Sequence, residues 1–147
     1  MIMNLQGDFR LSRSIMLDND LEQVTQLAAF VDEVCEVLEL DMGATMKINL
    51  GIEEAVVNVM SYAYTAGSSG NIEVVAKAND SHLFFVISDW GMPFDPTKQE
   101  EIDITLPAEE RNIGGLGIHL VRKTMDSIHY ERKDGKNILT LSKKLNS

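Results

Sequence analysis

One segment restricts the fold more than any other, because it reads as a buried helix with a polar residue at its centre. Residues 48–63 have the sequence INLGIEEAVVNVMSYA, and their apolar side chains recur at helical spacing. Asn58 lies inside that apolar run, although its amide competes for backbone groups and makes it a poor helix former. Glu54 precedes it by four residues, so both side chains lie on one face. Such a pair offers oxygens to a hydrated cation or to a reacting hydroxyl.

Length and composition predict one folded domain spanning residues 1–147. Hydrophobic residues make up 44% of the chain and charged residues 24%, which is typical of a globular protein. No apolar run reaches the length of about 18 residues that spans a bilayer. The first ten residues lack the apolar core of a signal peptide. Cys35 is the single cysteine and has no internal disulfide partner. We therefore expect a cytoplasmic protein without a membrane association.

The charge is unevenly distributed along the chain. The net charge of −10 argues against general binding to the phosphates of nucleic acid. Residues 111–147 hold eight Lys and Arg against three Asp and Glu, a net charge of +5, whereas residues 1–110 carry −15. This asymmetry has two interpretations: an ordinary solvated surface, or a basic end that attracts an anionic ligand with acidic surface left for a protein partner.

Periodicity and turn residues predict the order strand, helix, helix, hairpin, long loop, helix, hairpin. Hairpin connections favour antiparallel pairing, and three helices need a sheet face to cover their apolar stripes. We therefore predict an α+β fold, a two-layer α/β sandwich with a mostly antiparallel mixed sheet covered on one face by three helices. The predicted strands are residues 9–17, 72–78, 83–88, 128–132 and 137–145. The predicted helices are residues 20–39, 42–65 and 115–126, and the long loop is residues 95–113.

Two further motifs accompany the Glu54 and Asn58 pair. The run Asp89-Trp90-Gly91-Met92-Pro93-Phe94 directly follows an apolar strand. Gly114-Gly115-Leu116-Gly117 comes at the start of the last predicted helix, where backbone N–H groups and the helix dipole favour anions. Together the three segments indicate a nucleotide site.

In order along the chain, residues 54–58 (EAVVN), 89–91 (DWG) and 115–117 (GLG) resemble the N, G1 and G2 boxes of the GHKL ATPase superfamily, which has the Bergerat or HATPase_c fold. Within that superfamily the chain is most similar to the small anti-sigma-factor serine kinases of bacterial partner-switching systems. The resemblance covers nearly the whole chain. It implies ATP and Mg²⁺ as cofactors.

The resemblance also implies a role for each matching residue. Asn58 would bind the magnesium ion, and Glu54 would be the general base that takes a proton from the attacking hydroxyl. Asp89 would accept a hydrogen bond from the adenine amino group, and Gly91 would let the ring approach the backbone. Each residue also has a purely structural alternative, such as a solvated helix acid for Glu54 or a turn cap for Asp89.

The remaining site residues lie around the predicted lid, residues 95–113. Phe94 is assigned to the nucleotide site with the glycine motif, whose backbone N–H groups would lie near the phosphates. Arg111 is the single basic residue between Lys98 and Arg122. We hypothesise that Arg111 reaches the γ-phosphate when the lid closes, so that Arg111→Ala would lower turnover far more than ADP affinity.

Three positions depart from the family pattern. Pro93 replaces a second glycine of the G1 box and stiffens the start of the lid. Asn137 and Ile138 stand near the place of a frequent Gly-Thr pair, and Tyr62 occupies a position where some of these kinases carry His. Nucleotide binding is still expected despite these departures, but they leave the rate of phosphoryl transfer open.

The sequence leaves two functions in competition. The first is a serine/threonine protein kinase that phosphorylates a STAS-domain anti-anti-sigma partner and sequesters a sigma factor or another regulator. The alternative is a non-catalytic ATP/ADP-binding module of the same partner-switching type. A detached histidine-kinase domain fits poorly, because none of His82, His119 and His129 lies on a dimerisation helix. A homodimer is also expected from the resemblance.

Overall fold

The computed structural model describes residues 9–64, 69–98 and 113–145, with residues 113–117 described as backbone only. The chain order is strand, two helices, a hairpin, one helix and a second hairpin, as predicted. The strands are β1 (Leu11–Asp18), β2 (Asn71–Ala78), β3 (His82–Asp89), β4 (Ser127–Lys133) and β5 (Lys136–Lys144). The helices are α1 (Val24–Val37), α2 (Met42–Tyr62) and α3 (Ile113–Thr124), with short 3-10 turns η1 (Leu21–Gln23) and η2 (Pro96–Lys98).

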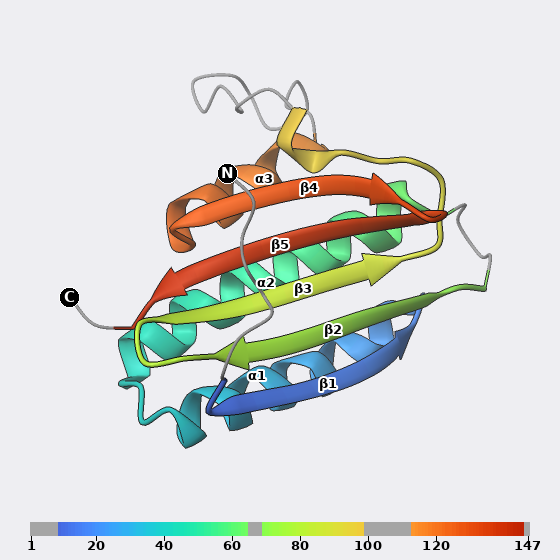
Figure 1. Cartoon of the computed structure of the whole chain (residues 1–147). Coiled ribbons are helices and arrows are strands. Elements are labelled where there is room, and N and C mark those ends of the chain that lie inside the picture. The colour runs from blue at the N-terminus through green and yellow to red at the C-terminus, as the bar shows by residue number, and fades with distance from the viewer. Residues whose placement is uncertain (1–8, 65–68, 99–112, 146–147) are drawn as a thin grey trace.

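The five strands form one sheet in the order β1-β2-β3-β5-β4. Each neighbouring pair is antiparallel. The last strand of the chain, β5, therefore lies inside the sheet between β3 and β4. The three helices cover one face of this sheet (Figure 1). The prediction of a two-layer α+β sandwich is confirmed.

The core lies between the sheet and the helices. It forms because successive side chains of a strand point to opposite faces of the sheet, so that every second one faces the helices. On β2 and β3 every second side chain is fully buried against the helix layer, at 0–1% exposure. Burial of each large apolar side chain contributes about 1.5–3 kcal/mol, before the entropy of ordering it is subtracted. The buried residues of these two strands include Ile72, Val74, Leu83, Phe85 and Ile87.

The helix α2 is the longest element, and its start has a clear local cause. The Asp41 carboxylate accepts a hydrogen bond from the Ala44 backbone N–H at 2.7 Å, which caps the free N–H groups of the first turn. Despite its length, α2 is too polar to cross a bilayer, and no helix in the described part of the chain is long and apolar enough to do so.

The helix α3 begins at Ile113, two residues earlier than the predicted start at residue 115. Gly114, Gly115 and Gly117 therefore lie within the first turns of the helix. Boundaries at glycine-rich segments are hard to predict, because glycine has low helix propensity and carries no side chain with periodicity.

Candidate nucleotide site

The structure brings the C-terminal end of α2 against the segment that follows β3. The Met92 backbone N–H donates to the Ala63 carbonyl at 2.8 Å. A Cβ on Gly91 would come within 2.2 Å of that same carbonyl oxygen. Gly91 is thus required by the close packing of two protein segments, which is an additional reason to the ligand approach expected from the sequence.

Asn58 lies on α2 and is only 5% exposed. Its Nδ2 donates to the Glu54 backbone carbonyl at 3.0 Å, which fixes the orientation of the amide. No residue in the described part of the chain donates to its Oδ1. A buried amide oxygen without a donor fits the role of a hard oxygen ligand for Mg²⁺.

Glu54, Asn58 and Tyr62 follow one another at intervals of four residues along the same face of α2. The Tyr62 ring stacks on Phe94, with ring centroids 5.3 Å apart and planes 24° from parallel. The helix face that carries Glu54 and Asn58 therefore continues to the segment after β3. Partial burial raises the pKa of Glu54 above its ordinary value, and the neighbouring Glu53 carboxylate raises it further.

Asp89 ends β3 and is 1% exposed. Its Oδ1 accepts hydrogen bonds from the Gly91 backbone N–H and from Asn137 Nδ2, both at 2.9 Å. Burial raises the pKa of this carboxyl, while the two hydrogen bonds and the nearby Arg132 lower it in part. Within the described residues, Oδ2 has no donor and stays available to accept a hydrogen bond from a ligand.

Asn137 is a residue of the candidate site that was predicted only as a departure from the family pattern, without a role in the site. It is paired with Asp89 in the β3–β5 register, and its Oδ1 accepts from the Phe94 backbone N–H at 3.1 Å and the Tyr130 hydroxyl at 2.5 Å. Its Nδ2 also donates to the Met92 carbonyl at 2.8 Å. All of the amide's hydrogen-bonding positions are thus used within the protein. An Asn inside a strand was the available clue, because Asn is depleted there.

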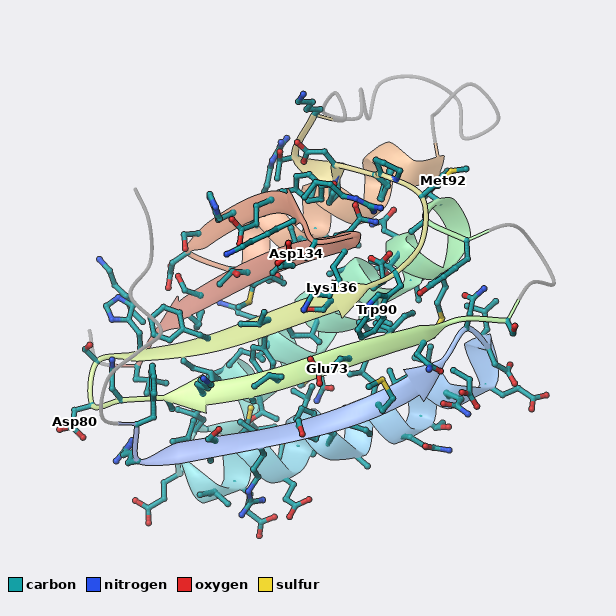
Figure 2. All side chains as sticks on the ribbon, turned by 45° about the vertical axis from the view of Figure 1, so that its right-hand side comes forward. Glu73, Asp80, Trp90, Met92, Asp134 and Lys136 are labelled. Carbon is teal, nitrogen blue, oxygen red and sulfur yellow. The ribbon has the colours of Figure 1, made fainter. Side chains whose placement is uncertain are left out.

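Two further side chains hold the segment after β3. The Tyr64 hydroxyl accepts from the Trp90 backbone N–H at 3.0 Å and donates to the Asn71 carbonyl at 2.7 Å. Arg132 Nη1 donates to the Gly91 carbonyl at 2.8 Å. Trp90 and Lys136 lie together at this end of the sheet (Figure 2), with the ammonium group 5.9 Å from the ring centroid.

Much of the predicted lid, together with Arg111, lies outside the described residues. The start of the lid is held by η2, where Arg122 Nη2 on α3 donates to the Thr97 carbonyl at 2.7 Å. Gly114, Gly115, Leu116 and Gly117 are placed only as backbone at the N-terminal end of α3. Their predicted contact with phosphates, and the predicted role of Arg111, stay predictions.

Residues 17–143 match the family described as the histidine kinase-like ATPase domain. The chain belongs to this family. The resemblance inferred from the three boxes is therefore confirmed, and the family supports the prediction that the chain binds ATP.

Named relatives within the histidine kinase-like ATPases point to serine kinases. The chain is 30% identical over 95 residues to the serine/threonine-protein kinase BtrW of Bordetella bronchiseptica, an alignment covering 65% of this chain and 67% of the relative. It is 29% identical over 96 residues to the serine-protein kinase RsbW of Listeria monocytogenes, covering 63% and 61%. The alignments thus span about two thirds or less of these relatives. They support the prediction of a protein kinase.

A solved structure shares the fold. The crystal structure of the RsbU and RsbW domains of a Mycobacterium tuberculosis protein superposes with a TM-score of 0.64 at 18% identity. The superposition covers 90% of this chain and 32% of that chain. At this level of identity the comparison supports the fold alone.

Proposed function

We propose that this chain is an ATP-dependent serine/threonine kinase that phosphorylates a STAS-domain anti-anti-sigma protein and sequesters a sigma factor or an equivalent regulator. The observation that carries the proposal is the buried Asn58 amide. Its Oδ1 has no donor among the described residues, and it lies one helical turn from Glu54 on a face that continues through Tyr62 to Phe94. The family match and the names of the relatives support it.

In the proposed site, Asp89 provides specificity for the base. Its Oδ1 is held by Gly91 and Asn137, so Oδ2 is the oxygen left to accept a hydrogen bond from the adenine amino group. A purine with a carbonyl oxygen at that position would face a carboxylate and be rejected, because neither group donates. Asn58 would hold Mg²⁺ through Oδ1, and the bound ion would neutralise phosphate charge during transfer.

Glu54 would act as the general base. The hydroxyl oxygen of the protein substrate attacks the γ-phosphorus, the bond from that phosphorus to the bridging oxygen of ADP breaks, and the hydroxyl proton passes to Glu54. Because burial raises its pKa, Glu54 is a better proton acceptor than an exposed carboxylate. Arg111 is proposed to stabilise the charge on the transferring group.

The experiment compares Glu54→Gln with Glu53→Gln, using labelled ATP, magnesium and a purified STAS-domain protein from the same genome. We expect Glu54→Gln to lower the transfer rate by about 10²- to 10⁴-fold, as loss of a general base does, with an unchanged ADP affinity. Glu53→Gln is the matched control and should retain most of the transfer rate at a saturating concentration of the STAS-domain protein. Equal rates for the two variants would exclude Glu54 as the base.

The alternative, a non-catalytic nucleotide-binding module, is supported by the departures at Pro93 and Asn137. The same experiment separates the two functions. Calorimetry that detects ATP binding by the wild-type chain, without any phosphorylated STAS protein, would favour the binding module. Absence of any adenine nucleotide binding would exclude both.

A further inference from the structure

A large surface groove lies beside the candidate nucleotide site but does not include its residues, between the C-terminal half of α1 and the N-terminal half of α2. Its volume is about 840 Å³. Its α2 wall carries Met42, Met46 and Leu50, which are 79%, 66% and 41% exposed. These side chains follow at intervals of four residues and form one apolar stripe, roughly 12 Å long over two helical turns. Contiguous exposed apolar side chains of this kind indicate an interaction site, whereas apolar residues scattered singly over a surface do not.

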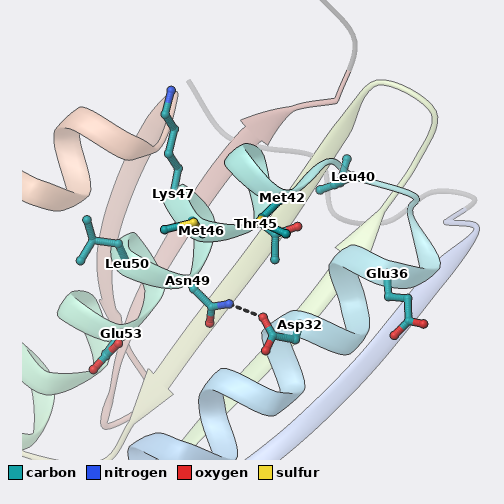
Figure 3. Close-up of a pocket in the computed structure, with 10 residues that line it drawn as sticks. All are labelled: Asp32, Glu36, Leu40, Met42, Thr45, Met46, Lys47, Asn49, Leu50 and Glu53. Carbon is teal, nitrogen blue, oxygen red and sulfur yellow. Dashed lines mark hydrogen bonds between the residues drawn. The ribbon is translucent and has the colours of Figure 1, made fainter.

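The rim of the groove is acidic. Asp32 and Glu36 border it from α1, and Glu53 borders it from α2. Asn49 Nδ2 donates to the Asp32 carboxylate at 2.5 Å across the groove, which holds that charge in place (Figure 3). Among the described residues, Lys47 is the basic one that lines the groove, and its side chain extends away from α1. Three carboxylates thus border the apolar stripe of Met42, Met46 and Leu50.

We propose that this groove docks an amphipathic helix of a protein partner, with an apolar stripe flanked by Lys or Arg. The space between two helices receives the ridge of a third helix, and flexible methionines adapt to the side chains that enter. The acidic rim complements basic flanks and repels anionic ligands, including nucleotides and a second copy of the same rim. The charge pattern therefore selects the partner.

The groove lies close to the proposed general base, so a partner docked there could be positioned for phosphorylation. Leu50, at the end of the apolar stripe, lies one turn before Glu54 on α2. A helix seated in the groove would hold its protein close to the proposed general base. Docking itself does not require kinase activity, but this role in presenting a phosphoacceptor rests on the proposed function.

The test uses the full chain with its methionine methyl groups labelled with ¹³C, so that residues inside and outside the groove report in one spectrum. The probe is a 14-residue helix, stapled on its polar face, with leucines at one helical stripe and lysines on both flanks. We expect the probe to shift the Met42 and Met46 methyl signals and to leave those of Met16 and Met92 unchanged. A twin peptide with glutamates in place of the lysines should bind at least 10-fold more weakly.

Three outcomes would overturn the proposal: no shift at Met42 and Met46, larger shifts at Met16 or Met92, or equal binding of the two peptides. Met46→Lys should weaken binding of the lysine peptide at least 10-fold, whereas the control Met16→Lys, at an exposed position on β1, should not. Thermal unfolding verifies that both variants fold. If Met46→Lys converts a wild-type dimer into a monomer, the occupant is a second copy and the proposal fails.

A kinase assay separates this inference from the proposed function. Met46→Lys should raise the KM for the STAS-domain protein at least 5-fold and leave ADP affinity unchanged. If the wild-type chain transfers no phosphate but the methionine signals shift as expected, the docking proposal is supported and the proposed kinase function is rejected. If transfer proceeds with an unchanged KM in Met46→Lys, the kinase stands and the groove does not present the substrate.

Discussion

At the scale of single residues, Asn137 and Asp89 form the most densely bonded pair in the candidate site. They lie opposite each other on β5 and β3, and both are almost fully buried. The Asn137 amide connects the carboxylate to Met92, Phe94 and Tyr130. Because these groups are buried or partly buried, each would lose a hydrogen bond without replacement by bulk water if the amide were removed.

We predict that Asn137→Leu weakens both the fold and nucleotide binding. Leucine has a similar volume but removes the hydrogen bonds that Asn137 makes with Asp89, the Phe94 N–H and the Met92 carbonyl, each at a cost of about 1–3 kcal/mol where the remaining group is fully buried. The midpoint of thermal unfolding should fall, and calorimetry should find at least a 10-fold weaker ADP affinity. The control is Ile138→Val, on the opposite face of β5. Wild-type ADP affinity in Asn137→Leu would contradict the role of the amide.

A second prediction concerns the pH dependence of stability. Since burial raises the pKa of Asp89, the native state retains this proton over a pH range in which the unfolded chain has lost it. The free energy of unfolding therefore falls as pH rises from the unfolded pKa to the higher native pKa. Asp89→Asn has no such proton, so urea titrations at several pH values should show a shallower decline. The raised pKa of Glu54 also makes the free energy of unfolding fall as pH rises, but it does so equally in the wild type and in Asp89→Asn. Parallel curves would contradict this prediction.

At the scale of elements, the crossing of α2 and α3 depends on a glycine within a helix. A Cβ at Gly51 would lie 2.3 Å from Thr124 Oγ1, and that hydroxyl is itself bonded to the Leu120 carbonyl at 2.9 Å. The glycine costs helix propensity but lets the two helices approach closely. At Gly43, by contrast, the nearest atom would be 3.5 Å away.

These two glycines of α2 make a matched pair for mutation. We predict that Gly51→Ala destabilises the protein by about 1–3 kcal/mol, because the added methyl group overpacks the crossing. Gly43→Ala should be neutral or stabilising by up to about 1 kcal/mol. Denaturant titration measures both, and Thr124→Ala should recover part of the loss when combined with Gly51→Ala. Equal effects at the two glycines would show that helix propensity, and not the crossing, decides.

At the scale of the whole molecule, the net charge of −10 opposes compaction by self-repulsion. We predict that raising sodium chloride from 50 to 500 mM increases the thermal midpoint at pH 7, because salt screens this repulsion. The gain should amount to about 2–4 °C for each kcal/mol of stabilisation. Near the sequence pI of about 4.6 the increase should largely vanish, which is the internal control. A lower midpoint in high salt at pH 7 would contradict the prediction.

The elements, their order and the three motifs are predictable from the amino-acid sequence. Periodicity, caps and turn residues act over a few positions, so the helix face with Glu54 and Asn58 and the hairpins around β3 and β5 could be predicted from neighbouring residues alone. Boundaries at the glycine motif could not, because glycine carries no periodic side chain.

The packing of the sheet against the helices sets which distant residues share the site. The role of Asn137 follows from the β3–β5 register, which places it opposite Asp89, 48 positions earlier in the chain. The need for glycine at position 91 follows from its approach to Ala63, and the acidic groove follows from the packing of α1 on α2. Such contacts form because the chain buries its apolar stripes together, and that geometry is a property of the packed layers rather than of any local pattern.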